Sequence, residues 1–321
     1  MDKNVINEDE LYRVYSSELK RMYGEKVYKI PINLPVTCPN RDGKVGTGGC
    51  IYCGSMGAGH ESLESNISVK DQFEQNSAYI RKRYNAKKFI TYFQNFSNTY
   101  MPIEQFKEFM KAGIQKDVLE MAISTRPDCI SDEYLKYLKA LSNENNVKIT
   151  IELGLQTVNY KTLKIINRGH GLAEFIDAVY RIKSHGFKVC AHLIIDLPWD
   201  DIVDVIEAAK VLSALRVDYV KLHALYIVKN TRLAELYANE EVTLLTKEDY
   251  INRVIEFLMY LDKDIVLQRL IGRAPEKDTI TANWNTSWWK IKDELLEKMI
   301  INGYRQGMKC NYLNGRALKD I

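Results

Sequence analysis

The chain has 321 residues, of which 46% are hydrophobic and 27% are charged, and its formal net charge at pH 7 is +3. This balance is typical of a globular protein and excludes a disordered or fibrous one. The small net charge permits a nucleic-acid partner but does not by itself indicate one. The segment 1–10 is polar and acidic, unlike a signal peptide, and no apolar run reaches the ~18 residues of a membrane span. We therefore expect a soluble, cytoplasmic protein without membrane contact.

Two kinds of apolar pattern recur along the chain: apolar residues at helical spacing, and short apolar runs typical of strands. Segment 9–24 carries apolar residues at helical spacing and is expected to form an amphipathic helix. Six short apolar, β-branched runs then predict strands at 26–34, 88–94, 118–124, 147–154, 187–196 and 217–226. Helical patterns separate these runs at 68–86, 103–115, 131–144, 159–167, 172–185 and 201–215.

This alternation predicts an α/β fold built from βαβ units with a parallel sheet. Right-handed crossovers would curl the six strands into a full or partial (β/α)6 barrel, whereas an open, doubly wound sheet satisfies the same periodicity. After residue 230 the pattern changes to a helix at 246–261, a strand at 264–271 and a helix at 288–301. We therefore expect an N-terminal helix, a core and a C-terminal extension, at 1–25, 26–235 and 236–321.

Three of the six cysteines, Cys38, Cys50 and Cys53, lie within sixteen residues. In a chain without an export signal, such clustering indicates a metal site rather than a disulfide framework. A tight turn in Cys-x2-Cys brings two sulfurs together, and the glycine-rich loop before it can return Cys38 to the same point. The remaining cysteines lie in or beside apolar segments and are interpreted as structural: Cys129, Cys190 and Cys310.

The number of ligands separates two kinds of metal site. A structural zinc site takes four protein ligands, and His60 could complete a Cys3His set. An iron–sulfur cluster held by three thiolates instead leaves one iron open to a ligand, as a catalytic site requires. The cysteine loop follows the first predicted strand, at the end where parallel α/β folds assemble their active sites. This position favours the cluster, with zinc as the alternative.

Polar residues also stand at the carboxyl ends of the other five predicted strands. They are Gln94 and Asn95, then Ser124 to Asp128, then Glu152 and Gln156, then His192 and Asp196, and finally Lys221 and His223. Each has an ordinary structural interpretation: Thr125 to Asp128 as a helix cap with its salt bridge, Glu152 with Lys221 as an ion pair, and the histidines as core residues. Together they predict a polar pocket for a zwitterionic ligand that carries a nucleoside.

With these features, the chain resembles the radical S-adenosylmethionine enzymes. It resembles in particular the bacterial branch related to the Elongator catalytic subunit and, distantly, to the oxygen-independent coproporphyrinogen oxidase. The resemblance runs over about residues 10–310. The motifs that carry it are Thr37-Cys-Pro-Asn-Arg-Asp-Gly, Thr47-Gly-Gly-Cys-Ile-Tyr-Cys, Thr125-Arg-Pro-Asp-Cys, Glu152-Leu-Gly-Leu-Gln, Asn167-Arg-Gly-His and Lys221-Leu-His.

The resemblance implies a partial (β/α)6 barrel that holds a [4Fe–4S] cluster and S-adenosyl-L-methionine. It implies that the open iron binds the amino and carboxylate groups of this cofactor, and that one electron yields methionine and a 5′-deoxyadenosyl radical. An electron donor such as flavodoxin or ferredoxin is then expected. By resemblance, the cofactor contacts would be Gln94 and Asn95 near the methionyl amine, Ser124 facing the ligand, Gln156 and His192 at the ribose, and Arg168 on the methionyl carboxylate.

The same branch implies a tRNA substrate, whose wobble uridine side chain would be converted from carboxymethylaminomethyl towards aminomethyl. Lys221 and His223 are the candidate catalytic residues facing the substrate, with Arg269 and Arg273 as further anion contacts. The basic segment 81–88 and the aromatic residues Trp284, Trp288, Trp289 and Tyr304 either contact RNA or belong to a solvated helix face and a packed tryptophan cluster. The alternatives are a radical oxidoreductase acting on a small metabolite or tetrapyrrole, and a zinc-stabilised, non-catalytic RNA-binding protein.

Overall fold

The computed structural model describes residues 7–54, 57, 62–273 and 278–318, so that His60 lies outside the described residues. The strands are β1 Val27–Ile32, β2 Lys88–Phe93, β3 Val118–Thr125, β4 Lys148–Gln156, β5 Lys188–Ile194, β6 Tyr219–His223, β7 Ile227–Val228, β8 Val266–Arg269 and β9 Thr279–Thr281. The helices are α1 Tyr15–Tyr23, α2 Val69–Tyr84, α3 Ile103–Ala112, α4 Asp132–Asn145, α5 Tyr160–Ile165, α6 Leu172–Ser184, α7 Ile202–Ala214, α8 Arg232–Ala238, α9 Lys247–Tyr260 and α10 Trp288–Asn302.

The order of the strands decides between the two fold types that the sequence left open. The main sheet has the order β1-β2-β3-β4-β5-β6-β8, and the pairs β1–β2, β2–β3, β3–β4 and β6–β8 are parallel. A doubly wound sheet reverses its strand order at a switch point, whereas a barrel-type sheet adds each strand beside the preceding one. The predicted α/β fold of the partial (β/α)6 barrel type is therefore confirmed.

The N-terminal helix is shorter than predicted. The first half of the expected helix at 9–24 is wrong, because Glu8–Glu10 forms a separate 3-10 turn and α1 begins only at Tyr15. Between these two elements, Val14 forms a parallel bridge with Leu267, and the backbone N–H of Leu267 donates to Arg13. The carbonyl of Arg13 thus accepts a hydrogen bond from strand β8 and does not take part in the hydrogen bonding of a helix at this point.

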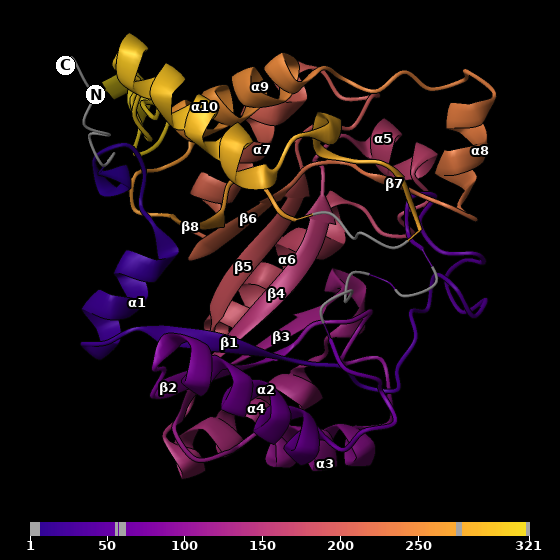
Figure 1. Ribbon diagram of the computed structural model, residues 1–321, viewed down its shortest axis with the longest axis vertical. Helices are drawn as coiled ribbons and strands as arrows, with labels where there is room; N and C mark the ends of the chain where they lie inside the picture. Colours follow the sequence, from indigo (N-terminus) through magenta and orange to yellow (C-terminus); the bar gives the residue numbers. More distant parts are fainter. Residues whose placement is uncertain (1–6, 55–56, 58–61, 274–277, 319–321) are drawn as a thin grey trace. The chain divides into compact units, whose positions relative to one another are not determined.

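The chain divides into two compact units, which we call the cysteine-loop unit (Leu19–Leu155 and Leu163–Cys190) and the C-terminal unit (Met1–Glu18, Gln156–Thr162 and Ala191–Ile321). In the cysteine-loop unit, β2 and β3 are buried along almost their whole length, as expected for a parallel sheet covered on both faces. Helix α2 packs on β1 and touches α3, which in turn touches α4 (Figure 1). The core of this unit is fully buried around Ile30, Phe89, Phe93 and Phe106.

In the C-terminal unit, α9 packs against α7 and α10, and the side chains of Tyr219, Tyr250 and Phe257 are fully buried. The sequence analysis missed α8 and the antiparallel pair β7–β9, whose strands have only two and three residues. Among the described residues, no helix combines the length and the apolar character needed to cross a membrane.

Candidate metal centre

The loop after β1 carries the three clustered cysteines, and all of its contacts described below lie within the cysteine-loop unit. Two turns shape it: the N–H of Arg41 donates to the carbonyl of Cys38 at 2.8 Å, and the N–H of Cys53 donates to the carbonyl of Cys50 at 2.9 Å. The second is the tight turn predicted from the Cys-x2-Cys spacing. The three cysteines are free of disulfide bonds, so that all three thiols are available as ligands.

Each of the three thiols lies beside a different guanidinium group. The contacts are Arg41 Nη2 to Cys53 Sγ at 3.1 Å, Arg168 Nη1 to Cys50 Sγ at 3.6 Å, and Arg126 Nη1 to Cys38 Sγ at 3.9 Å. Arginine stays protonated in proteins, and it donates but does not accept hydrogen bonds. The loop is therefore surrounded by positive charge directed at its sulfur atoms.

Arg126 is fixed by the turn that follows β3. Its Nε and Nη2 donate to the two carboxylate oxygens of Asp128 at 2.8 and 2.7 Å, and only 3% of its side chain is exposed. This bidentate pair is the salt bridge that the sequence analysis considered for Thr125 to Asp128. The remaining Nη1 reaches both Cys38 and the main-chain carbonyl of Arg168, at 2.8 Å from the latter.

Arg168 and Arg41 are held mainly by backbone carbonyls. Arg168 Nη2 donates to Gly154 at the end of β4 at 2.7 Å. Arg41 Nη2 donates to the carbonyls of Cys53 and Gly54 at 2.8 and 2.5 Å, and its guanidinium lies 5.2 Å from the ring centre of Phe96. Both side chains are thus oriented by the fold rather than by a carboxylate among the described residues.

The Asn167-Arg-Gly-His turn is locked against the cysteine loop. Asn40 Nδ2 donates to the carbonyl of Asn167 at 2.5 Å, and Asn167 Nδ2 donates to the carbonyl of Gly49 at 2.9 Å. Gly169 has a left-handed φ of +77°, and a Cβ placed on it would lie 2.6 Å from Asn40 Oδ1. The glycine of this motif is therefore required both by its backbone conformation and by the close approach of the loop.

Several buried polar atoms around the loop have no hydrogen-bond partner among the described residues. These atoms are Arg168 Nε, Arg41 Nε, Asn40 Oδ1 and His170 Nε2. Burial, together with Arg168 and Arg126, lowers the pKa of His170 to about 3, so that its imidazole is neutral at physiological pH. The Nε atoms of Arg168 and Arg41 are donors, and buried donors without partners are costly unless a further group satisfies them. Three thiols surrounded by cationic donors fit an anionic group such as a thiolate-ligated iron–sulfur cluster.

Three other predicted cofactor residues, Gln94, Asn95 and Ser124, lie in the same unit. Asn95 is buried and donates to Asn33 Oδ1 at 2.6 Å, while its own Oδ1 has no partner among the described residues. Ser124 donates to the hydroxyl of Tyr92 at 3.2 Å. Gln94 continues from β2, and its N–H donates to the carbonyl of Ile32 at the end of β1. Their proposed contacts with a cofactor remain predictions.

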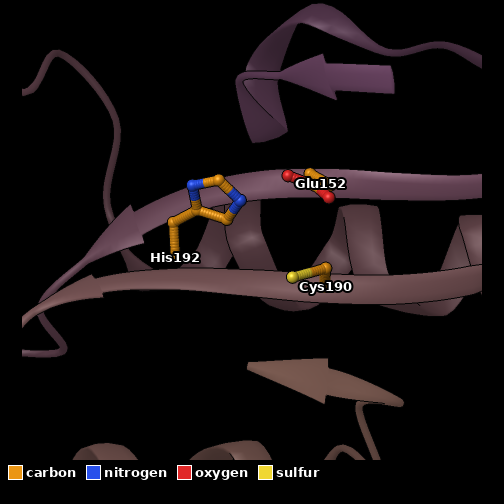
Figure 2. A group of neighbouring side chains, drawn as sticks. All are labelled: Glu152, Cys190 and His192. Atoms are coloured by element: carbon orange, nitrogen blue, oxygen red, sulfur yellow. The ribbon is translucent and has the colours of Figure 1, made fainter. Parts of the chain in front are cut away.

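Glu152 on β4 pairs with Lys29 on β1, with an Nζ–Oε1 distance of 2.5 Å, and the sequence analysis had not named this partner. Figure 2 shows Glu152 on β4 and the side chains of Cys190 and His192 on β5. Cys190 and His192 are two residues apart on one strand, so that they share a face of the sheet. Cys190 is fully buried, which agrees with its interpretation as a structural residue.

In the C-terminal unit, His192 contacts His223, one of the two candidate catalytic residues of β6. His192 Nδ1 lies 3.3 Å from His223 Nε2, and Arg269 Nη2 lies 2.7 Å from His223 Nδ1. Lys221 is buried two residues before His223. Gln156, at the end of β4, has a φ of +76°, a left-handed conformation that is uncommon for a residue with a side chain.

The basic segment and the tryptophans considered for RNA contact lie in different parts of the fold and differ in exposure. The basic segment 81–88 covers the end of α2 and the start of β2, at the amino edge of the sheet, where Arg81 pairs with Asp117. It does not line the cysteine loop, which follows the carboxyl end of β1. Trp284 packs on Tyr250 and donates to the carbonyl of Leu245, whereas Trp288 and Trp289 are 41% and 50% exposed.

The sequence analysis missed Asn40 and Arg41 as contacts of the metal loop, and it saw Arg126 only as part of a salt bridge. The positions of these three residues in the sequence indicate that they lie close to the cysteine loop. Asn40 and Arg41 follow Cys38 within three residues, and Arg126 follows the carboxyl end of β3 directly. The fold and the loop together define an α/β protein with three free cysteines, a candidate metal centre, at the carboxyl edge of a parallel sheet.

Comparison with known proteins identifies the family. The model of the Radical SAM superfamily matches residues 34–212, and that of the Radical SAM C-terminal domain matches residues 217–300. The chain belongs to the radical SAM superfamily and is an enzyme. Members of this family use a [4Fe–4S] cluster and S-adenosylmethionine.

Three individual similarities accompany the family match. An uncharacterized protein of Methanocaldococcus jannaschii is 34% identical over 309 residues, which cover 95% of this chain and 94% of that protein. The tRNA uridine(34) acetyltransferase of Methanocaldococcus infernus is 27% identical over 204 residues, which cover 63% of this chain and 36% of that protein. The structure of the archaeal M. infernus Elp3 has the same fold, with a TM-score of 0.69 and 18% identity over 87% of this chain and 64% of that chain.

Proposed function

We propose that this chain holds its [4Fe–4S] cluster on Cys38, Cys50 and Cys53 and cleaves S-adenosylmethionine reductively. The observation that carries the proposal is the set of three free thiols in one loop, beside the buried Nε donors of Arg41 and Arg168, which have no partner among the described residues. When bound, such a cluster supplies the electron that splits the sulfonium into methionine and a 5′-deoxyadenosyl radical. The protein's own residues bind and orient the cofactor and exclude water.

The substrate that we propose is a tRNA whose wobble uridine side chain is converted from carboxymethylaminomethyl towards aminomethyl, in a cytoplasmic reaction. Supporting this choice are the relative named as a tRNA uridine(34) acetyltransferase and the fold shared with archaeal Elp3. The guanidinium of Arg269, whose Nη2 lies 2.7 Å from His223 Nδ1, supplies hydrogen-bond donors suited to a substrate anion. The exposed rings of Trp288 and Trp289 offer surfaces on which an unpaired base can stack. An electron donor such as flavodoxin or ferredoxin belongs to this proposal.

The test of the first step is anaerobic reconstitution with iron and sulfide, followed by an assay of S-adenosylmethionine cleavage with dithionite. We expect about four irons per chain and formation of 5′-deoxyadenosine. The single variants Cys38→Ala, Cys50→Ala and Cys53→Ala should lose both. The matched control is Cys310→Ala, which removes a cysteine outside the loop and should retain both. Retention of the cluster by any of the three loop variants would contradict the ligand assignment.

The test of the substrate uses tRNA from a strain that lacks the gene. Incubation with the reconstituted enzyme should change the mass of the wobble nucleoside by loss of the carboxymethyl group. Binding of this tRNA should weaken as the salt concentration rises. A small metabolite that stimulates formation of 5′-deoxyadenosine, with tRNA inactive, would instead establish the radical oxidoreductase alternative.

A further inference from the structure

Three sequence motifs separated by many residues each contribute one arginine to one cysteine of the metal loop. The loop itself supplies Arg41, the turn after β3 supplies Arg126, and the turn before α6 supplies Arg168. We propose that these three guanidinium groups set the reduction potential of the cluster by stabilising its reduced state. The inference rests on the proposed assignment of the cluster to Cys38, Cys50 and Cys53.

The physical reason is the charge that the cluster gains. A cluster held by thiolates is anionic, and one-electron reduction by an external donor makes it more negative. Hydrogen bonds to the sulfurs, net charge and solvent exposure are the properties by which a protein adjusts such a potential. A permanent positive charge in a buried, weakly screened position favours the reduced form over the oxidised form.

The three arginines differ in the charge that they bring to the loop. Arg126 is paired with Asp128, which offsets its charge. Among the described residues, Arg41 and Arg168 form no ion pair with a carboxylate and are held by backbone carbonyls, and each retains a buried Nε without a partner. Their contacts with sulfur, at 3.1 and 3.6 Å, are also shorter than the 3.9 Å contact of Arg126. Arg41 and Arg168 are therefore expected to contribute most.

Asp128 gives the proposal a test with the opposite sign. Its carboxylate accepts hydrogen bonds from the guanidinium of Arg126, the side chain that contacts Cys38. The negative charge of Asp128 therefore offsets part of the positive charge at the loop. Replacement by asparagine removes the negative charge and retains an oxygen that can accept from Arg126. The potential should then rise, whereas loss of Arg41 or Arg168 should lower it. A purely structural loosening of the loop has no reason to give opposite signs.

The experiment measures the midpoint potential of the cluster in the full-length, reconstituted protein. Reduction is followed by visible absorption and electron paramagnetic resonance, with iron and sulfide contents determined for each variant. Arg41→Gln and Arg168→Gln should each lower the ratio of reduced to oxidised cluster about tenfold at a fixed potential. For a one-electron couple, this corresponds to a midpoint potential that is lower by about 59 mV. Arg41→Lys keeps the positive charge and should therefore have a midpoint potential close to that of the wild type. Asp128→Asn should have a higher midpoint potential than the wild type. The matched control is Arg83→Gln on α2, which removes an exposed arginine beside Tyr79 and should leave the potential unchanged.

Unchanged midpoint potentials in Arg41→Gln and Arg168→Gln proteins that carry a full cluster would overturn the inference and leave the proposed function intact. If these two variants assemble no cluster, Arg41→Lys and Asp128→Asn still decide. A lowered or unchanged potential in Asp128→Asn overturns the proposal, and a raised potential supports it. A wild-type chain that assembles no cluster would overturn both the inference and the proposed function.

Discussion

The guanidinium of Arg126 donates to the main-chain carbonyl oxygen of Arg168 over a distance of 2.8 Å. This bond joins the turn after β3 to the turn before α6, although the two residues are 42 positions apart in the sequence. Since each residue also contacts a loop cysteine, the bond fixes the two arginines and their two thiols as one assembly. The stability of the loop should therefore depend on the residues that hold these side chains.

The first prediction concerns Asp128, the partner of buried Arg126. Asp128→Ala would leave this guanidinium buried without its carboxylate, and loss of one partner of a buried ion pair costs about 3–5 kcal/mol. Urea unfolding of the protein before cluster reconstitution should show this loss in the free energy of unfolding. The control Glu235→Ala removes an exposed pair with Arg232 and should leave that free energy unchanged within error. Equal stability of the two variants would contradict the structural importance of the Arg126–Asp128 pair.

The second prediction separates steric collision from backbone strain at Gly169. Gly169 and Gly186 both have a φ of +77°, but a Cβ on Gly169 would lie 2.6 Å from Asn40 Oδ1, whereas a Cβ on Gly186 would meet only the end of Lys139 at 3.5 Å. Gly186→Ala should cost about 1–2 kcal/mol through its left-handed conformation alone. Gly169→Ala should cost more and should also reduce the iron bound per chain after reconstitution. The same iron content in both variants would show that Asn40 can move away without disturbing the loop.

The third prediction concerns pH and Asp196 in the C-terminal unit. Burial raises the pKa of Asp196 to about 7, although the backbone N–H of Leu225 and the nearby Arg253 act in the opposite direction. The folded state thus holds this proton more tightly than the unfolded state. The stability from this group is present at low pH and is lost as the pH rises through about 7, by at most about 4 kcal/mol.

Asp196→Asn removes this titration and keeps an oxygen that can accept from Leu225. The free energy of unfolding of the variant should vary less between pH 5 and pH 8 than that of the wild type, so that the variant is the more stable protein at pH 8. Chemical unfolding at a series of pH values measures both curves. Parallel curves would show that Asp196 is not the group responsible.

The fourth prediction separates cleavage of the cofactor from modification of the substrate. His223 contacts His192 and Arg269 in the C-terminal unit, and we propose it as a substrate-facing residue. His223→Ala should retain cleavage of S-adenosylmethionine within a few-fold. It should lower the yield of modified tRNA at least about tenfold, as expected when one contact worth about 1.4 kcal/mol is removed. The control His185→Ala, at the end of α6, should retain both activities. An equal loss of both activities in His223→Ala would place this histidine in the cleavage step instead.

Much of the fold followed from local patterns. The six predicted strands of the core correspond to β1–β6, and the six predicted helices between them correspond to α2–α7, within a few residues at each end. These elements are long and strongly periodic. The elements that were missed or wrongly extended are β7, β9, α8 and the start of α1. They are short, or they depend on a backbone partner such as Leu267 that lies far along the chain.

The sequence by itself determined the order of the elements, the group of three cysteines that indicates the metal, and the membership of the family that the comparisons confirm. Only the tertiary structure decided which residues surround the thiols. Arg126 and Arg168 reach Cys38 and Cys50 across 88 and 118 residues of sequence. No local spacing encodes these contacts, because they form only after parallel strands bring their carboxyl ends to one edge of the sheet. The physical reason is that hydrogen bonds and charge act over a few ångströms in space, whatever the distance along the chain.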